Sequence, residues 1–600
     1  MRRKLLILRL LSLIVLLHVA PPIADAEGGG DRRVNVPYFG DGVAWAESAV
    51  FWLGKVDPPG APGKNYADIR VAYTAEELAI FVNVVDYYFW YDPDDAQPND
   101  PTDYDAVAIF LDTAHDGAGS PQQDDYTFTR GLCLYGCGDG SRFYKEGRGT
   151  GTGWDMAWTA DWTAGTWASW HGNPPHNNNT NLFDYGWWTY IHLPWEALGR
   201  TGPPASGTVW GLGVILYDRD DLPPAGAVAP QSWPQDLGST HPDTWGELNF
   251  GVPAWDPPAV VEQGTTVIRR GLGQSVVEDS WVGGGGTCSG GHEGDPYSDN
   301  YGTSADLFVE NQELIADFPC FSKSFLRFHL DPIPAGKVIM SATLSLHHWS
   351  NADWTRAEPS LIWLSTVDGN WEENTLTWNN APLARANLSA TWVDVITPEN
   401  SPDRPGVRYD WDATQAVAEA YAAREPLNIA LYTADVNFHS SKYLTASDTG
   451  DWNAEGRPTL TIIWGQEPQL NKYHQTAPAS PEIGLTFGDT ITYTLEVEGS
   501  GQALDVVDVL PAQISHPLAY DASAGAVAYD PAARKLTWAG TPGVGQTVVI
   551  VYPVTVMQDG TYAIINTAYM TAADGGAFTA RSTIIVEPRH FFLPCVLRQR

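Results

Sequence analysis

Three runs of alternating apolar and polar side chains lie between Tyr66 and Gly117. The apolar positions of these runs are Ile69, Val71, Tyr73, Ile80, Val82, Val84, Val107, Ile109 and Leu111. A period of two is typical of strands that bury one face and expose the other, because successive side chains point to opposite sides. The pattern therefore predicts half-buried strands in an antiparallel sheet.

The second and third runs are separated by a long loop, from Tyr87 to Asp105. The loop opens with consecutive aromatic residues, Tyr87 to Tyr91, and continues with several carboxylates. Binding groups concentrate in loops that a rigid sheet holds in place. We therefore expect a binding site in this loop.

The composition fits an exported all-β protein with many turns. Aromatic residues make up 12% of the chain and charged residues 18%, and there are 58 Gly and 44 Pro. The formal net charge of −38 argues against nucleic acid and anionic lipid as partners, because both are negatively charged. Divalent cations and neutral partners suit such a surface better.

Residues 1–26 have the three parts of a secretory signal peptide. A basic start (Arg2, Arg3 and Lys4) precedes an apolar stretch, Leu5 to Val19, and an Ala-Asp-Ala cleavage pattern ends at Ala26. No later stretch is long and apolar enough for a transmembrane helix. We therefore predict a secreted or cell-surface protein, with attachment to the cell envelope as an open alternative.

The alternating segments continue along the chain and predict an all-β fold of three tandem antiparallel β-sandwich domains. The predicted domains span residues 31–255, 260–465 and 470–588, and residues 589–600 form a C-terminal tail. One helix is expected, from Asp412 to Ala423, with the Asp412 side chain as its cap.

The first predicted domain resembles the family-nine carbohydrate-binding modules. The resemblance rests on V-A-Y-T-x-E-E-L-A-I-F-V-x-V-x-D, on Y-D-A-V-x-I-F-L-D-T and on the later pieces WWTYIHLPWEALG, WGLGVILYDRDD and TWGELNFG. It implies a β-sandwich that holds a sugar between two Trp side chains. Trp90, beside Tyr91, lies in the matching loop, and Trp233 is the candidate partner. Structural packing in the core remains the alternative for these rings.

Two further resemblances cover the rest of the chain. Residues 260–465 resemble the DNRLRE domain, a β-sandwich related to some polysaccharide-binding modules, through SFLRFHLDPIPAGKVIMSATLSLH, TLTWNNAP, YDWDATQAVAEAYA and RPTLTIIW. Residues 470–588 resemble the immunoglobulin-like repeat called domain of unknown function eleven, which implies a spacer. The terminal RHFFLPCVLRQR is similar to short sorting segments of large secreted bacterial proteins, and an ordinary frayed tail is the alternative.

Carboxylates in and after the loop predict a calcium site that stiffens it. Asp92, Asp94 and Asp105 offer oxygen ligands, and Asp112, before Asp116, offers a second candidate position. Calcium takes six to eight oxygens, mostly from carboxylates and carbonyls. A solvated acidic turn is the alternative interpretation, because the spacing of an EF-hand is absent.

Five Cys in an exported chain predict disulfides. Cys133 and Cys137 are close enough in sequence to bridge a turn, Cys288 and Cys320 can pair within the second domain, and Cys595 is left over. No Cys–His spacing matches a zinc site.

The sequence predicts a carbohydrate-binding protein rather than an enzyme. It contains no Gly-x-Ser-x-Gly elbow, no His-Glu-x-x-His and no phosphate loop. We predict a neutral or weakly charged polysaccharide or oligosaccharide as partner and no organic cofactor. Basic residues gathered in space, such as Arg269, Arg270, Arg404 and Arg408, would instead favour an acidic polysaccharide. The rival hypothesis is a structural or adhesion protein whose domains have lost ligand binding.

Overall fold

The computed structural model describes residues 32–586, with gaps at 56–62, 93–99, 135–140, 171–183, 222–224, 258–259, 261, 285–295, 314–317, 319, 437–439, 467–468, 478–484, 500 and 574–575. The described residues are almost entirely β-strands, as the sequence predicts. Among them, no helix has the length and apolar character needed to cross a membrane. The predicted signal peptide and C-terminal tail lie outside the described residues.

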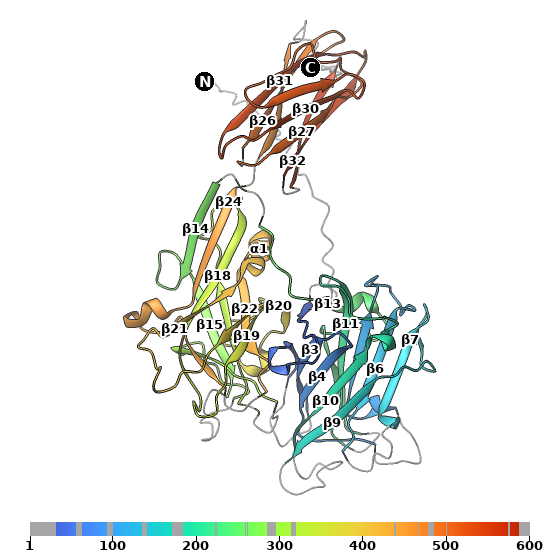
Figure 1. Ribbon diagram of the computed structural model, residues 1–600, viewed down its shortest axis with the longest axis vertical. Coiled ribbons are helices and arrows are strands. Elements are labelled where there is room, and N and C mark those ends of the chain that lie inside the picture. The colour runs from blue at the N-terminus through green and yellow to red at the C-terminus, as the bar shows by residue number, and fades with distance from the viewer. Residues whose placement is uncertain are drawn as a thin grey trace, which may run out of the picture.

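The first sandwich, drawn in blue to green at the lower right of Figure 1, packs two sheets face to face. One sheet has the order β2-β3-β4-β10-β9, with the bounds β2 (Ala49–Gly54), β3 (Tyr66–Tyr73), β4 (Glu77–Val85), β10 (Asp184–Pro194) and β9 (Thr163–Trp170). The other has the order β1-β13-β11-β5-β6-β7-β8, with the bounds β1 (Arg33–Val36), β13 (Gly246–Phe250), β11 (Val209–Arg219), β5 (Ala106–Asp112), β6 (Asp125–Gly131), β7 (Tyr144–Gly149) and β8 (Trp154–Asp155). Strand β12 (Ala227–Trp233) pairs with β11 beside this path.

The three alternating runs predicted from the sequence correspond to β3, β4 and β5. Their burial differs from the prediction, because every residue of β3 and all but the first of β4 are buried. The second sandwich covers the outer side of β3: Arg70, at a polar position of the first run, donates hydrogen bonds to the backbone carbonyls of Gln312 (3.2 Å) and Asp435 (2.9 Å).

The second sandwich lies at the lower left of Figure 1 and also has two sheets. One is β15-β17-β22-β19-β20, with the bounds β15 (Val277–Gly283), β17 (Ser322–Phe328), β22 (Leu427–Thr433), β19 (Ser360–Val367) and β20 (Ala384–Val393). The other, called here the outer sheet, is β14-β24-β18-β23-β16 with β21 beside β18; its bounds are β14 (Glu262–Arg269), β24 (Thr459–Gln466), β18 (Val338–Asn351), β23 (Lys442–Thr445), β16 (Asp306–Val309) and β21 (Val407–Asp412).

Helices are short and few in the described part of the chain. The α-helix α1 (Thr414–Ala423) begins two residues after Asp412, whose Oδ1 accepts a hydrogen bond from the Thr414 backbone N–H at 2.9 Å. The predicted helix is therefore present, but it begins two residues later than expected, and its N-cap residue is Ala413 rather than Asp412. The 3-10 helices are η1 (Trp45–Glu47), η2 (Pro101–Asp103), η3 (Ser141–Phe143), η4 (Trp195–Leu198), η5 (Pro242–Thr244), η8 (Trp378–Asn380) and η9 (Asp451–Gly456).

The third sandwich stands apart from the other two, at the top of Figure 1, and has its own apolar core. Its first sheet is β25-β26-β31-β28, with the bounds β25 (Leu470–Ala477), β26 (Thr490–Glu498), β31 (Thr547–Thr555) and β28 (Asp521–Ala522). Its second sheet is β29-β30-β27-β32-β33, with the bounds β29 (Ala526–Asp530), β30 (Lys535–Gly540), β27 (Leu504–Val509), β32 (Tyr562–Ala572) and β33 (Ala577–Val586).

The first and second sandwiches share a core. Strand β1 pairs in parallel with β20 at Arg33 and Ala386, which joins one sheet of each sandwich. Beside this contact, the Asn35 N–H donates to Asn387 Oδ1 and the Asn387 amide donates to the Asn35 carbonyl, each at 2.8 Å. One apolar cluster contains buried residues of both sandwiches. The two sandwiches therefore act as one packed body rather than as units joined only by a linker.

A buried lysine marks the centre of this junction. Lys323 of the second sandwich is 1% exposed, and its Nζ lies 4.9 Å from the ring centroid of Trp52, 4.4 Å from that of Tyr66 and 3.7 Å from that of Trp378. Burial lowers the pKa of Lys323 to about 7, although the Asp68 carboxylate opposes the shift. Aromatic faces stabilise a buried cation, so this contact links the two sandwiches electrostatically as well as by packing.

Candidate functional site

The aromatic loop of the first sandwich does not present its rings to solvent. Trp90 is 5% exposed and Tyr91 is 2% exposed, and both belong to the shared core. The Trp90 backbone N–H donates to Asp105 Oδ2 at 2.7 Å, which holds the loop against the sheet. The expectation that Trp90 and Tyr91 grip a sugar is therefore corrected, because neither ring has a free face for stacking.

Trp233 is also part of the core, and it lies at the junction of the two sandwiches. Its side chain is fully buried, its ring centroid is 4.4 Å from that of Phe51, and its Nε1–H donates to the Ala384 carbonyl of the second sandwich at 3.3 Å. Trp233 therefore cannot stack on a sugar as the partner of Trp90. The packing alternative, left open by the sequence, describes both Trp side chains.

The same loop instead contributes to a buried group of carboxylates, called here the Asp86 cluster: Asp86, Asp105, Asp218 and Asp220. Ligand oxygens of Asp86, Asp218 and Asp220 all lie within 4.8 Å of one another, and the four residues are at most 6% exposed. Asp105 adjoins them and accepts the N–H groups of Trp90 (2.7 Å) and Arg219 (2.9 Å).

Within the described part of the chain, both carboxylate oxygens of Asp218 and the Oδ2 of Asp86 lack a hydrogen-bond partner. The adjacent Arg219 does not neutralise them, since its guanidinium donates to the carbonyls of Asp103 and Ala225. Burial raises the pKa of Asp86 to about 6, and burial followed by the Asp86 charge raises that of Asp218 well above its ordinary value. A divalent cation would remove this penalty, and carboxylate oxygens are the ligands calcium prefers.

The residues predicted from the sequence to bind calcium do not lie together in the structure. Asp105 belongs to the Asp86 cluster, whereas Asp94 lies outside the described residues. Asp92 is buried at 5% exposure and is not among the residues grouped around Asp86. The sequence analysis did not identify Asp86 and Asp218. The feature that could have identified them is a carboxylate at the end of an apolar strand.

Asp112 belongs to a second acidic group, with Asp124 and Asp125. Asp112 Oδ1 accepts the backbone N–H groups of Ala114 (3.1 Å) and His115 (2.6 Å), which is the geometry of a carboxylate that closes its own turn. Burial raises the pKa of Asp125 to about 7. The local bonds of Asp112 favour the acidic-turn interpretation at this position.

Cys133 and Cys320 are both disulfide-bonded. Their predicted partners, Cys137 and Cys288, and the leftover Cys595 lie outside the described residues.

The second sandwich carries partly exposed aromatic rings on and beside its outer sheet. Phe308 and Tyr443 stand between buried neighbours on β16 and β23, so their side chains point to the outer face. Their ring centroids are 4.7 Å apart, and Trp349 lies 5.7 Å beyond Tyr443. On the other side the row continues through Trp281, which is buried at 6% exposure and lies 4.7 Å from Phe308, to Tyr301, stacked on Trp281 at 3.7 Å.

A polar cavity of about 290 Å³ opens on the same outer sheet. It is lined by Arg269, Ser345, His347, Arg408, Glu455, Thr459 and Thr461. Burial lowers the pKa of His347, which keeps its imidazole neutral near pH 7 and able to accept as well as donate a hydrogen bond. We call the aromatic row and this cavity together the outer face.

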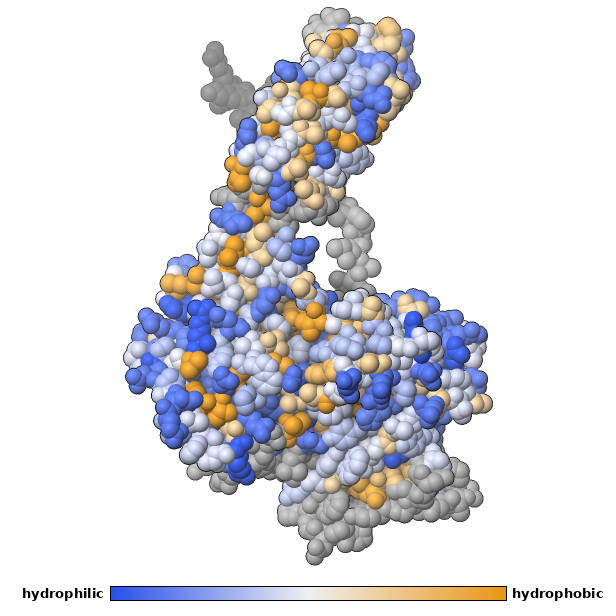
Figure 2. Space-filling model, in the orientation of Figure 1, coloured by the Kyte–Doolittle hydropathy of each residue, from blue (hydrophilic) through white to orange (hydrophobic). Residues whose placement is uncertain are grey.

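The arginines of the outer face are largely balanced by carboxylates. Arg408 Nε lies 2.7 Å from Asp410, and Arg404, which stacks on Trp349 at 3.7 Å, lies 3.5 Å from Asp306. Arg269 makes no ion pair with any described residue. The view in Figure 2 shows hydrophilic and hydrophobic residues intermixed, without one large apolar patch. The face is thus polar, close to neutral and aromatic.

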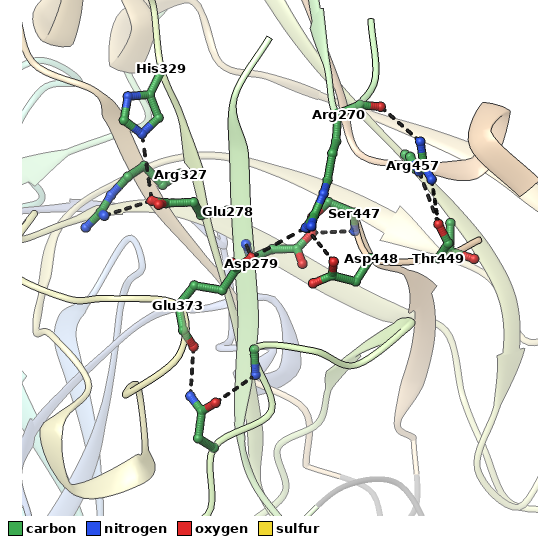
Figure 3. Close-up of polar contacts among 12 residues, drawn as sticks. Arg270, Glu278, Asp279, Arg327, His329, Glu373, Ser447, Asp448, Thr449 and Arg457 are labelled. Atoms are coloured by element: carbon green, nitrogen blue, oxygen red, sulfur yellow. Dashed lines mark hydrogen bonds and ion pairs between the residues drawn. The ribbon is translucent and has the colours of Figure 1, made fainter. Parts of the chain in front are cut away.

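A third acidic group, Asp279, Glu373 and Asp448, lies beside the outer face and is drawn in Figure 3. Arg270 extends into it, with its Nη1 2.6 Å from Asp448 and 3.8 Å from Glu373. Asp279 Oδ2 accepts the Ser447 N–H at 2.7 Å, and burial raises the Asp279 pKa to about 7. Because a guanidinium already occupies this group, it fits a structural ion-pair network better than a cation site.

Comparison with known proteins finds that the second sandwich matches a family of carbohydrate-binding modules. Residues 277–475 match carbohydrate-binding module family 96, which is less than half of the chain. No curated protein matches the chain. The matched segment contains the whole aromatic row of the outer face.

Solved structures show only distant similarity. A carbohydrate-binding module of family 9 from Caldicellulosiruptor kristjanssonii in complex with cellotriose is 16% identical, with a TM-score of 0.26, covering 37% of this chain and 95% of that one. A putative carbohydrate-binding protein from Bacteroides uniformis is also 16% identical, with a TM-score of 0.25 and coverages of 36% and 99%. The N-terminal domain of the Streptococcus gordonii adhesin Sgo0707 is 12% identical, with a TM-score of 0.19 and coverages of 45% and 60%. TM-scores this low transfer no ligand or site to this chain.

Proposed function

We propose that this chain is an exported, non-catalytic carbohydrate-binding protein that binds a neutral or weakly charged polysaccharide on the outer face of its second sandwich. The observation that carries the proposal is the partly exposed aromatic row, which lies within the residues that match a carbohydrate-binding module family. The first sandwich supports this face through the shared core and does not itself grip the glycan.

The outer face offers the two kinds of contact that sugars need. Aromatic faces such as that of Tyr443 pack against sugar C–H groups, and they bury apolar area without demanding charge. Arg269, Ser345 and His347 supply hydrogen-bond donors and acceptors for hydroxyl groups. The balanced arginines support hydroxyl-rich, neutral sugars over strongly anionic ones as the partner.

We also propose that the Asp86 cluster holds calcium with a structural role. The unpartnered oxygens of Asp218 support this, since a buried carboxylate without a donor is otherwise destabilising. Calcium there would fix the loop from Tyr87 to Asp105 through Asp105, and it would take no part in chemistry.

The test is isothermal titration of the full chain with neutral and uronate-containing oligosaccharides. The Tyr443→Ala variant should weaken binding by about 1 kcal/mol, roughly fivefold in Kd, because one stacking face is lost. Tyr473→Ala, which removes a ring that is 50% exposed on the third sandwich, is the matched control and should bind as the wild type does.

Two results would contradict the proposal. Equal losses in both variants would show that the outer face is not the site, and preferential binding of uronates would show that the charge argument is wrong. If no glycan binds, the structural or adhesion function becomes the better hypothesis, and the buried Trp90 and Trp233 already fit it for the first sandwich.

A further inference from the structure

A cavity of about 500 Å³, called here the junction cavity, lies where the first and second sandwiches meet. It shares no lining residue with the cavity of the outer face. The first sandwich contributes Arg33 of β1 and Glu247 of β13, which are opposite each other where these strands pair. The second sandwich contributes the ends of β19, β20 and β22 and one side of α1. Small-molecule sites of about 300–1,000 Å³ occur preferentially at such domain interfaces.

Small residues leave the space of the junction cavity open on two sides. On α1, the lining residues are Ala416, Ala420 and Ala423, whose spacing of four and three places them on one side of the helix. On the side of β22, a Cβ added to Gly369 would lie only 3.0 Å from the Asn428 side-chain nitrogen. Larger side chains at these positions would fill the cavity.

Charged hydrogen-bonding groups of both signs line the junction cavity. They are two arginines and three glutamates: Arg33, Arg385, Glu247, Glu419 and Glu425. Arg33 Nη2 lies 3.5 Å from Glu419 Oε1, but the buried Arg33 Nε has no hydrogen-bond partner among the residues that the structure describes. A buried donor without an acceptor lowers stability, and the hydroxyl oxygen of a ligand would satisfy it.

This lining favours a small, neutral, hydroxyl-rich ligand. Guanidinium N–H groups donate hydrogen bonds to hydroxyl oxygens, and carboxylates accept the hydroxyl protons. Because the charges of the two arginines and three glutamates nearly balance, neither a strongly anionic nor a strongly cationic ligand is favoured. Among the described residues, none of those that line the cavity is aromatic, so a ligand here would be held by hydrogen bonds and not by stacking.

We propose that the junction cavity is a second, separate binding site, which takes a neutral monosaccharide or disaccharide through hydrogen bonds from both sandwiches. Arg33 and Glu247 belong to the first sandwich, whereas Arg385 belongs to the second. A sugar that bonds to both sides binds only when the two sandwiches are packed together, so its binding stabilises the junction. The site is independent of the outer face, because the two have no lining residue in common.

The experiment is saturation-transfer NMR of the full chain with glucose, galactose, mannose, xylose and cellobiose, and with glucuronate as the charged comparison. We expect transfer to at least one of the five neutral sugars, and weaker transfer to glucuronate. The sugar that binds should also raise the midpoint of urea unfolding, because it binds only the packed junction. If none of the five neutral sugars receives saturation at millimolar concentration, or if glucuronate binds more tightly, the proposal is wrong.

Two variants locate the sugar in the junction cavity. Arg33→Met keeps the length of the side chain but removes its donors, and it should weaken binding about fivefold. Ala420→Phe fills the cavity from α1 and should abolish binding. Ala422→Phe adds the same ring to the same helix but beside a different cavity, so it is the matched control and should bind as the wild type does. Unchanged binding in Ala420→Phe would overturn the proposal.

Tyr443→Ala separates this site from the outer face. Short sugars should still bind the Tyr443→Ala variant and should no longer bind the Ala420→Phe variant. The opposite pattern would mean that short sugars bind only at the outer face, which would overturn the junction site and leave the proposed function standing. Loss of polysaccharide binding in Ala420→Phe but not in Tyr443→Ala would instead contradict the outer face and support the junction cavity.

Discussion

The first and second sandwiches are built from similar strands around one shared core, but the candidate aromatic site and the acidic group considered in each differ. In the first, Trp90 and Trp233 are buried, and Asp218 is held without a partner among the described residues. In the second, Tyr443 and Trp349 lie partly exposed, and the buried Asp279 group has Arg270 within it. The comparison indicates that the number of aromatic residues does not locate a binding site, whereas their direction relative to the sheet does.

The difference also separates two physical roles. Burying aromatic rings increases the packing energy of a domain but removes surface on which a ligand could stack. Leaving buried acids unpaired lowers the stability of a domain but provides ligands for a cation. Our proposal therefore gives support and ion binding to the first sandwich and glycan binding to the second. The following predictions test this division.

The largest effect is expected at Trp233, where the two sandwiches meet. Trp233→Ala should destabilise the protein by about 3–5 kcal/mol, because it opens a cavity in the shared core. Urea unfolding followed by circular dichroism measures the change. Trp452→Ala, which removes a ring that is 75% exposed on the second sandwich, should alter stability little. A small loss at Trp233 would mean that the junction is not a common core.

Calcium should stabilise the first sandwich. At a free concentration one hundred times its Kd, calcium is expected to add about 2.7 kcal/mol to the free energy of unfolding. The Asp218→Asn variant should lose this effect and, without calcium, should be more stable than the wild type. Asp448→Asn, in the Arg270-filled group, is the control and should keep the full calcium response. Unfolding at pH 7.5 with calcium and with a chelator provides the measurement.

Two buried groups, His348 in the second sandwich and Asp86 in the first, should contribute to stability with opposite pH dependences. His348 in the second sandwich is fully buried, and burial lowers its pKa to about 3. Its contribution to stability is complete above the unfolded pKa of about 6.5 and falls by up to about 1.4 kcal/mol for each pH unit below that. His348→Leu should flatten this slope in urea unfolding between pH 7 and pH 4.5.

Asp86 of the first sandwich is expected to show the opposite pH dependence. Asp86 has a folded pKa of about 6, above the unfolded value of about 3.9, so its contribution is complete at low pH and is lost as the pH rises from about 4 to 6. Calcium should remove this loss by replacing the proton. An Asp86→Asn variant with an unchanged pH profile would show that the cluster does not control stability in this range.

The smallest effect on a measured free energy is expected at Arg269, which lines the polar cavity of the outer face. Arg269→Ala should weaken glycan binding by about 1 kcal/mol through the loss of hydrogen bonds to hydroxyls. Thr265→Ala, on the same strand but away from the cavity, should leave the Kd unchanged. A gain in affinity for uronate-containing sugars in the wild type over neutral ones would instead assign the arginine a role in charge recognition.

Local features of the fold could be predicted because they depend on neighbours in sequence. The alternating runs predicted from the sequence correspond to β3, β4 and β5. Asp412 lies just before α1 and accepts the Thr414 N–H, although the N-cap residue itself is Ala413. In each case the controlling interaction lies within a few residues, so the sequence pattern is sufficient.

The candidate sites depended on contacts between distant residues, and there the sequence was a weaker guide. Trp90 was expected in a binding loop because it follows a strand, but the side on which the loop packs is set by the rest of the shared core. Asp86 and Asp218 are far apart in the chain and meet only when β4 and β11 pack in their sandwich. The outer face was indicated in part, since Arg269 and Arg408 were named from the sequence and line one cavity.

By itself, then, the sequence determined that this protein is all-β and where many of its strands and its helix lie, because backbone periodicity is local. Only the tertiary structure decided which aromatic rings are buried, which acids lack a partner and which buried amine pairs with a carboxylate. Lys472 and Asp508 come from strands of two different sheets, and no spacing in the sequence predicts their ion pair. The packing of the sandwich removes water from both side chains.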